Sequence, residues 1–141
     1  MVLSIFFYSG LFLEDEMDLS KIDDEAHKRL AKFAILKSNP AEGTSPLIVT
    51  SLVLEVMPLD DTIELETLKA EILKIKKYGL FWGVSNDVQL ENGQNKLRIS
   101  FAADTRRSYG VGTVVEAVLD LENFVAQAHV HSYKDEIVVR I

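Results

Sequence analysis

The chain has 141 residues, of which 48 % are hydrophobic and 26 % are charged, and its formal net charge is −7 at pH 7. These values are typical of a globular protein, so we expect one domain over residues 1–141 and exclude a disordered or fibrous chain. The absence of cysteine excludes disulfides and thiolate metal sites, and the acidic balance argues against nucleic acid as a partner, because lysine and arginine supply most of that affinity.

The N-terminal run over residues 1–13 is strongly apolar and predicts a buried strand at residues 2–8. It lacks the basic start and the small-residue cleavage site of a secretion signal, and it is shorter than the about 20 residues that cross a bilayer. We therefore expect a cytoplasmic protein without a membrane contact. The acidic stretch that follows, residues 14–25, includes Asp15 and Glu16, which we take as candidate contacts for a basic protein partner.

A first helix is predicted over residues 22–37, where apolar residues at helical spacing follow three consecutive acids that suit the positive end of a helix. His27 is expected on the polar face of this helix. Residues 47–57 are almost continuously apolar and predict a long interior strand. A right-handed crossover through the helix would make this strand a parallel neighbour of the strand at residues 2–8.

The clearest helical pattern lies between residues 61 and 79 and predicts a helix that faces the core. Its apolar stripe consists of Leu65, Leu68, Ile72 and Ile75. Asp61 and Glu64 form a candidate capping box, and Gly79 is a candidate C-terminal cap. Trp82 follows the helix, where it either covers the helix end or lines a pocket or an interface, so it is a candidate binding residue.

Two alternating patterns, at residues 88–90 and 97–103, flank a glycine-containing turn at residues 91–95 and predict a β-hairpin. Residues 105–112 then read as an exposed basic loop, a common location for binding residues. The candidate partner-binding residues in this loop are Arg106, Arg107 and Tyr109.

Residues 113–131 allow two interpretations. Thr113 and Glu116 suit a capping box, and the helix formers around them would give a third helix. The alternation of apolar and other residues over 124–131 favours strands instead, and this is the preferred interpretation. A turn at Lys134-Asp135 would then lead into a final strand over residues 137–141.

The histidines at 129 and 131 form the most prominent chemical motif. Residues two apart in a strand face the same side, so His129 and His131, with Glu136 as a third ligand, form a candidate metal site. The spacing resembles the first metal motif of cupins, but no second motif follows in this chain. We prefer the alternative that both histidines lie on a solvated sheet face, because two histidines alone leave metal coordination incomplete.

Together these elements predict an α+β fold in which two helices pack on one face of a single, largely antiparallel mixed sheet of about five or six strands. Without a complete catalytic set, we favour a non-enzymatic protein that binds another macromolecule. The sharpest form of this hypothesis is an acidic inhibitor of the immunity-protein type that neutralises a basic partner, and self-association through an exposed strand is a further hypothesis.

Two other functions stay open at this level. The first is a small metal-dependent or phosphate-directed enzyme that uses His129 and His131, and the second is a carrier of a small ligand in a pocket near Trp82. The leading hypothesis requires no cofactor.

Overall fold

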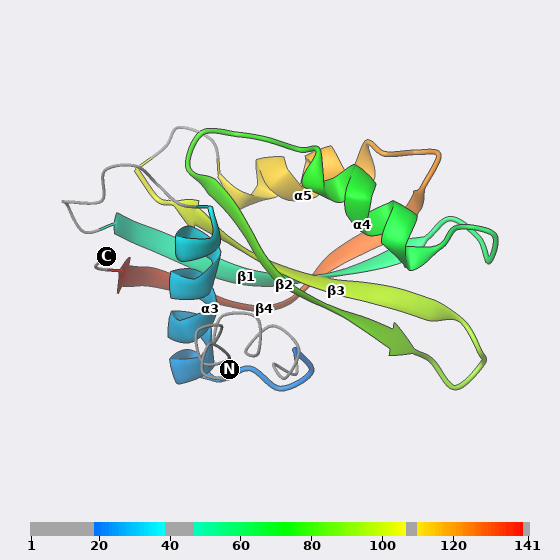
Figure 1. Cartoon of the computed structure of the whole chain (residues 1–141), viewed down its shortest axis with the longest axis horizontal. Helices are drawn as coiled ribbons and strands as arrows, with labels where there is room; N and C mark the ends of the chain where they lie inside the picture. The colour runs from blue at the N-terminus through cyan, green and yellow to red at the C-terminus, as the bar shows by residue number, and fades with distance from the viewer. Residues whose placement is uncertain (1–18, 39–46, 107–109, 140–141) are drawn as a thin grey trace, which may run out of the picture.

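The structure, a computed structural model, describes residues 19–38, 47–106 and 110–139 (Figure 1). The strand expected at residues 2–8 and its parallel pairing therefore lie outside the described residues. The same holds for four of the candidate partner-binding residues, which are Asp15, Glu16, Arg107 and Tyr109.

The described residues form three helices and a single sheet of four strands. In chain order the elements are α3 (Asp24–Lys37), β1 (Leu47–Pro58), α4 (Leu65–Leu73), β2 (Leu80–Gln89), β3 (Asn95–Asp104), α5 (Val111–Leu119) and β4 (Val125–Val139). The strand order is β2-β3-β1-β4, and each neighbouring pair is antiparallel. From β1 onward this is the βαββαβ arrangement of ferredoxin-like folds. The α+β class and the antiparallel pairing are confirmed. The described residues contribute four strands and three helices, where the sequence predicted about five or six strands and two helices for the whole chain.

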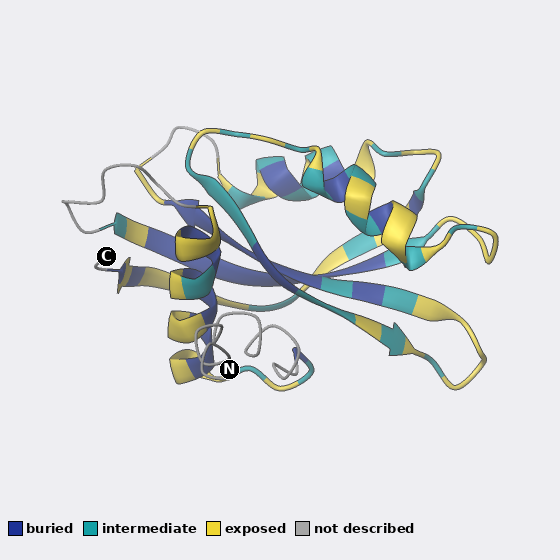
Figure 2. Ribbon diagram, in the orientation of Figure 1, coloured by how far each residue is buried: buried dark blue, intermediate teal, exposed yellow. Residues whose placement is uncertain are grey.

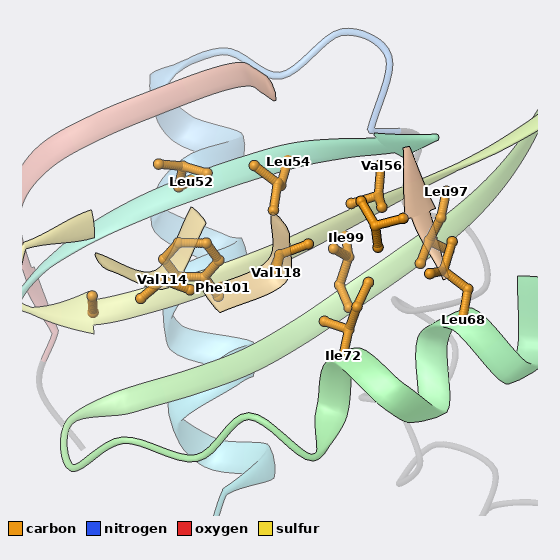
Figure 3. Close-up of a cluster of buried hydrophobic side chains, with 12 residues drawn as sticks. Leu52, Leu54, Val56, Leu68, Ile72, Leu97, Ile99, Phe101, Val114 and Val118 are labelled. Carbon is orange, nitrogen blue, oxygen red and sulfur yellow. The ribbon is translucent and has the colours of Figure 1, made fainter. Parts of the chain in front are cut away.

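The helices cover both faces of the sheet, not one face as predicted from the sequence. Alternate residues of a strand point to opposite faces, and here both sets are apolar. Figure 3 shows one face, where Leu68 and Ile72 of α4 and Val114 and Val118 of α5 meet β1 and β3 in a shared core. On the other face, α3 buries Ala31, Ala34 and Ile35 against Val49, Ala102, Ile137 and Val139. The two-sided burial explains why β1 is almost continuously apolar.

The first helix is confirmed within two residues of its predicted start. Asp23 is the N-cap, and its carboxylate accepts a hydrogen bond of 2.8 Å from the backbone N–H of Ala26. The acids Asp24 and Glu25 occupy the first turn, where the helix dipole favours negative charge. The local acidity of this part of the chain therefore has a structural cause.

The helix predicted over residues 61–79 is shorter than expected. Asp60 accepts a hydrogen bond from the Thr62 backbone N–H, which holds this segment in a turn, and α4 begins only at Leu65. Glu64 is the N-cap without a side-chain hydrogen bond, so the predicted capping box is absent. Gly79 has the expected positive φ of 83°, but it lies in the turn before β2 and not at the helix end.

Residues 113–131 contain both structures that were considered as alternatives. The first part is α5, because Val111, Val114, Val115 and Val118 recur at helical spacing and face the core. A turn over residues 122–124 follows, and β4 then starts at Val125. The strand runs without a break through Lys134 to Val139, so the predicted turn at Lys134-Asp135 is wrong.

Candidate partner-binding surface

Exposed apolar side chains gather on one side of the edge strand β4. In the register of β1 and β4, three of these side chains lie opposite residues of β1: Val130 opposite Leu54, Tyr133 opposite Leu52 and Val138 opposite Ile48. Paired residues point to the same face of a sheet, so these side chains share the face on which α4 and α5 pack. We call Ile48, Val130, Tyr133 and Val138 the β4 stripe. Their exposure lies between 40 % and 62 %, and Figure 2 shows exposed residues along much of β4. Within residues 19–38, 47–106 and 110–139, β4 has a strand partner on one side only, and apolar side chains aligned along such an edge are typical of a protein-binding surface.

Bulges in β4 shape the end of this stripe. The register between β1 and β4 shifts three times, and one shift lies beside Thr50, whose hydroxyl donates a hydrogen bond of 3.0 Å to Asp135. At this bulge Glu136 has a φ of 57°, a left-handed conformation that non-glycine residues rarely adopt. The bulge borders a hollow of about 520 Å³ that Ile48, Thr105, Asp135, Glu136 and Val138 line. Bulges of this kind often turn side chains toward a functional surface.

Arg106 lies at the same end of the sheet. The backbone N–H and the hydroxyl of Thr105 both donate to the carbonyl oxygen of Ile48, which ties the start of the predicted basic loop to the β4 stripe. Arg106 forms a forked ion pair with buried Asp104, with two nitrogen-to-oxygen distances of 3.0 Å, and this hydrogen bonding raises the pKa of the guanidinium. Arg106 is half exposed, and of the three candidate binding residues in the predicted loop it is the one that lies among the described residues.

A buried carboxylate lies on the opposite face of the sheet, the face that α3 covers. Glu55 is only 5 % exposed, and its oxygens lie 3.0 Å from Lys96 Nζ, 2.6 Å from Arg98 Nε and 2.8 Å from His129 Nε2. His131 Nδ1 lies 3.4 Å away, while its Nε2 donates to the Ser20 carbonyl oxygen. We call these five side chains the charge cluster.

The charge cluster holds Glu55 ionised. Burial by itself raises the pKa of Glu55, but the hydrogen bonds from Arg98 and Lys96, the positive charge of Lys96 and the hydrogen bond from His129 together lower it to about 2. Arg98 and His129 are also the direct partners of Glu55 in the registers of β3 and β4. Because a slip of one residue would move this carboxylate into the apolar core, the cluster fixes the pairing of three strands.

His129 and His131 contact the same carboxylate, but it is Glu55 and not Glu136. Glu136 instead lines the hollow at the far end of β4. Among the described residues, no three His, Cys, Asp or Glu side chains are placed to hold a metal ion. The sequence contained a signal for the actual partner, since Glu55 is the sole acid in the apolar run 47–57 and faces the alternating pair Lys96 and Arg98.

Trp82 lies at the start of β2, beside a second hollow. Its indole N–H donates to the Ile75 carbonyl oxygen at 2.9 Å, and its ring packs edge-on against Phe101 with ring centres 5.2 Å apart. The hollow has a volume of about 330 Å³ and is lined by both apolar and basic side chains, and we call it the lysine hollow. Its walls include Leu73, Leu80, Trp82, Lys37, Lys76 and Lys77.

His27 is buried, contrary to its predicted place on a polar helix face. Its two ring nitrogens lie 2.9 Å from Ser51 Oγ and 2.8 Å from Ser132 Oγ, so α3 is hydrogen-bonded to both β1 and β4. Burial lowers the pKa of His27 and outweighs the opposing effect of Asp24 and Asp23. The neutral imidazole is therefore the form that suits the fold.

Comparison with known proteins places the βαββαβ part of the chain in a described family. Residues 51–139 match the family described as the EF-1 guanine nucleotide exchange domain. This segment starts within β1 and ends with β4, and it contains α4, β2, β3 and α5. Among the described residues, no helix is both long and apolar enough to cross a membrane.

Curated relatives agree with this match. The chain is 28 % identical over 126 residues to a probable elongation factor 1-delta of Drosophila melanogaster, which covers 85 % of this chain and 49 % of the relative. It is 34 % identical over 83 residues to elongation factor 1-beta of Penicillium citrinum, covering 59 % of this chain and 36 % of the relative. It is 32 % identical over 88 residues to elongation factor 1-beta of Candida albicans, and this alignment covers 60 % of this chain and 40 % of the relative. The chain thus spans less than half the length of these relatives.

Proposed function

Because this chain belongs to the EF-1 guanine nucleotide exchange domain family, we propose that it promotes guanine nucleotide exchange on a GTP-binding elongation factor. The observation that carries the proposal is the extent of the match, which covers nearly the whole βαββαβ unit and not an isolated motif. The names of the relatives support the same assignment, since they are elongation factors 1-beta and 1-delta. A role in translation elongation fits the cytoplasmic localisation expected from the sequence.

Nucleotide exchange of this kind requires a binding surface and no covalent chemistry from the exchange factor. A protein that binds the nucleotide-free form of a GTPase more tightly than the loaded form weakens nucleotide affinity by the same factor, because the two binding equilibria are linked. The proposed role is therefore a specific case of the non-enzymatic protein binding that the sequence favoured. We propose it in place of the acidic inhibitor, and a contact with a GTPase in place of self-association.

The β4 stripe is the surface that we propose for the GTPase. It combines a large aromatic side chain, three aliphatic side chains, a strand edge with which no described strand pairs, and an adjoining hollow. Buried aromatic anchors commonly carry most of the energy of a protein interface. Tyr133, which is 62 % exposed in the chain alone, is the strongest candidate for such an anchor.

The direct test is release of a fluorescent GDP analogue from a purified GTP-binding elongation factor, followed by stopped-flow fluorescence with and without this chain. We expect the chain to accelerate release, and a Tyr133→Ala variant to be roughly tenfold less effective, as for a typical interface anchor. Leu36→Ala is the matched control, since Leu36 is also an exposed apolar residue but lies on α3.

The outcomes separate the function from the surface. Failure of the unmodified chain to accelerate release at any concentration would refute the exchange function. Acceleration that Tyr133→Ala leaves unchanged would keep the function and reject the β4 stripe as the contact. Because Tyr133 is exposed, the substitution should change the free energy of unfolding by no more than about 0.5 kcal/mol, which thermal unfolding can verify.

A further inference from the structure

His27 joins α3 to two neighbouring strands from behind the β4 stripe. α3 lies across the sheet on the face opposite the stripe (Figure 1). The imidazole is 1 % exposed, and its ring nitrogens lie 2.9 Å from Ser51 Oγ in β1 and 2.8 Å from Ser132 Oγ in β4. A neutral imidazole donates from one nitrogen and accepts at the other, and a serine hydroxyl can take either role, so a single tautomer satisfies both contacts. His27 therefore bridges β1 and β4 at one point.

Ser132 belongs to a short part of β4 that lies between two bulges. Residues 132–134 pair in register with residues 51–53 of β1, and the register shifts immediately before and after them. A bulge interrupts the ladder of backbone hydrogen bonds, and no described strand pairs with β4 on its other side. Tyr133 is the middle residue of this short segment. Its position therefore depends strongly on contacts from outside the sheet.

α3 supplies two such contacts, and they differ in strength. Ser132 contacts His27, and Lys134 Nζ lies 3.1 Å from Asp24 Oδ2. The side chains of Lys134 and Asp24 are 37 % and 70 % exposed, and an exposed ion pair of this kind contributes little. Loss of the Ser132 contact would leave a nitrogen of the buried imidazole without its partner, which costs more. His27 is thus the main link between α3 and residues 132–134.

Ser132 and Tyr133 point to opposite faces of the sheet. Successive side chains of a strand alternate, so Ser132 faces α3 while Tyr133 faces the side of the stripe. A rotation of this segment about its own axis would turn both side chains together. Fixing Ser132 from behind therefore fixes the direction of Tyr133.

We propose that His27 is a positioning residue for the β4 stripe, and that its hydrogen bond to Ser132 holds Tyr133 in the orientation that meets the GTPase. The GTPase part of this inference rests on the exchange function proposed above. Without the hydrogen bond the segment samples other orientations, and the apparent affinity for the partner falls with the fraction of molecules in the competent one. A helix that precedes the matched residues 51–139 thereby contributes to the exchange surface.

The test variant is Ser132→Ala, which removes the hydroxyl that His27 contacts and leaves Tyr133 in place. Ser132→Thr keeps a hydroxyl and should behave like the unmodified chain. Ser100→Ala is the matched control, because Ser100 lies on the α3 face opposite Val53 and its hydroxyl is hydrogen-bonded to the backbone of Val84, away from β4. It removes two buried hydrogen bonds and should lose at least as much stability in thermal unfolding as Ser132→Ala does.

The first measurement is release of the fluorescent GDP analogue at increasing concentrations of each variant. Ser132→Ala should raise the concentration that gives half-maximal acceleration roughly fivefold, the effect of one lost hydrogen bond, and should keep the maximal rate. Ser100→Ala should change neither value, although it is destabilised. Equal half-maximal concentrations for Ser132→Ala and Ser100→Ala, or a Ser132→Thr variant as weak as Ser132→Ala, would overturn the proposal.

The second measurement does not depend on the exchange function. Amide hydrogen exchange, followed by mass spectrometry, should be roughly fivefold faster for residues 132–134 in Ser132→Ala than in the unmodified chain, and unchanged there in Ser100→Ala. If the unmodified chain does not release the nucleotide, the exchange function fails, and this measurement still decides whether His27 fixes β4. Unchanged hydrogen exchange at residues 132–134 would overturn the positioning role even if nucleotide release became slower.

A double variant connects the two residues. His27→Ala should produce both effects, and adding Ser132→Ala to it should produce no more, because the two substitutions remove the same contact. Additive effects would show that Ser132 acts independently of His27 and would contradict the proposal. If His27→Ala does not fold, the comparison of Ser132→Ala with Ser132→Thr and Ser100→Ala decides the question.

Discussion

Replacing Glu55 by glutamine tests the charge cluster directly. The substitution keeps the size of the side chain but removes the negative charge that Lys96 and Arg98 share. Glu55 is 5 % exposed, so water cannot take the place of the lost charge, and two cations that are mostly buried remain close together. We therefore expect a large loss of stability from a change that alters only one atom of the side chain.

The size of the loss follows from the pKa of Glu55. The pKa of Glu55 falls from its ordinary value of 4.5 to about 2 in the folded protein. The folded state therefore favours the charged carboxylate more than the unfolded state does, and this difference stabilises the fold at neutral pH. At about 1.4 kcal/mol for each pH unit by which a pKa moves, this amounts to about 3 kcal/mol at neutral pH. Breaking a buried ion pair by removing one partner typically costs about 3–5 kcal/mol, which agrees with this value.

The sign of the pH dependence gives a second measurement. The folded-state pKa of Glu55 is depressed, so its contribution is complete above pH 4.5 and is lost as the pH falls toward about 2. Urea unfolding at a series of pH values should show Glu55→Gln less stable by about 3 kcal/mol near neutrality, with a difference that shrinks in acid. The control Glu25→Gln breaks an exposed pair with Lys28 and should cost less than about 1 kcal/mol. Equal stability of Glu55→Gln and the unmodified chain, or a difference that does not vary with pH, would refute the reasoning.

Two further predictions concern the α3 side of the sheet and the glycines. Burial lowers the pKa of His27 from 6.5, so the stabilising contribution of the neutral imidazole is complete above pH 6.5 and is lost as the pH falls through the lower folded-state pKa. In His27→Gln, the free energy of unfolding should therefore vary less steeply with pH just below 6.5 than in the unmodified chain. An unchanged slope would contradict this. Gly83→Ala would place its Cβ 2.9 Å from Ser100 Oγ and should cost about 1–3 kcal/mol, whereas Gly112→Ala in α5 meets no atom within 4 Å and should gain up to about 1 kcal/mol. Urea unfolding measures the free energy of unfolding of both glycine variants. If both variants changed it in the same direction, the space around each glycine would not explain the result.

Elements whose pattern is set by local physics could be predicted from the sequence. The first helix follows from its N-terminal acids, and the β2–β3 hairpin from its alternation and the turn around Gly93, whose φ is 89°. The boundaries of α4 could not be predicted, because a single hydrogen bond from the Thr62 backbone N–H to Asp60 competes with helix formation. Residues 113–131 contain a helical period, which belongs to α5, followed by the alternation of a strand, which belongs to β4. The preference for strands throughout this segment was wrong because the segment holds two consecutive elements.

The sites depended on strand pairing, which a single sequence does not specify. The two histidines were correctly placed on one side of a strand, but their partner Glu55 is 74 residues from His129 and becomes visible only when β1 and β4 pair. The β4 stripe was missed because the assumed turn at Lys134-Asp135 separated Val138 from Tyr133. The lysine hollow combines the ends of two helices on opposite faces of the sheet, and no local pattern indicates such a meeting.

The position of α3 ahead of the matched segment affects how this protein can be divided. The match begins at residue 51, inside β1, whereas Ala31, Ala34 and Ile35 of α3 cover Ala102 and Ile137 on one face of the sheet. A recombinant fragment cut at residues 51 and 139 would expose that face to water and would be prone to aggregate. The smallest fragment that keeps both faces covered must therefore begin before α3, at or ahead of Leu19, whose side chain is also fully buried.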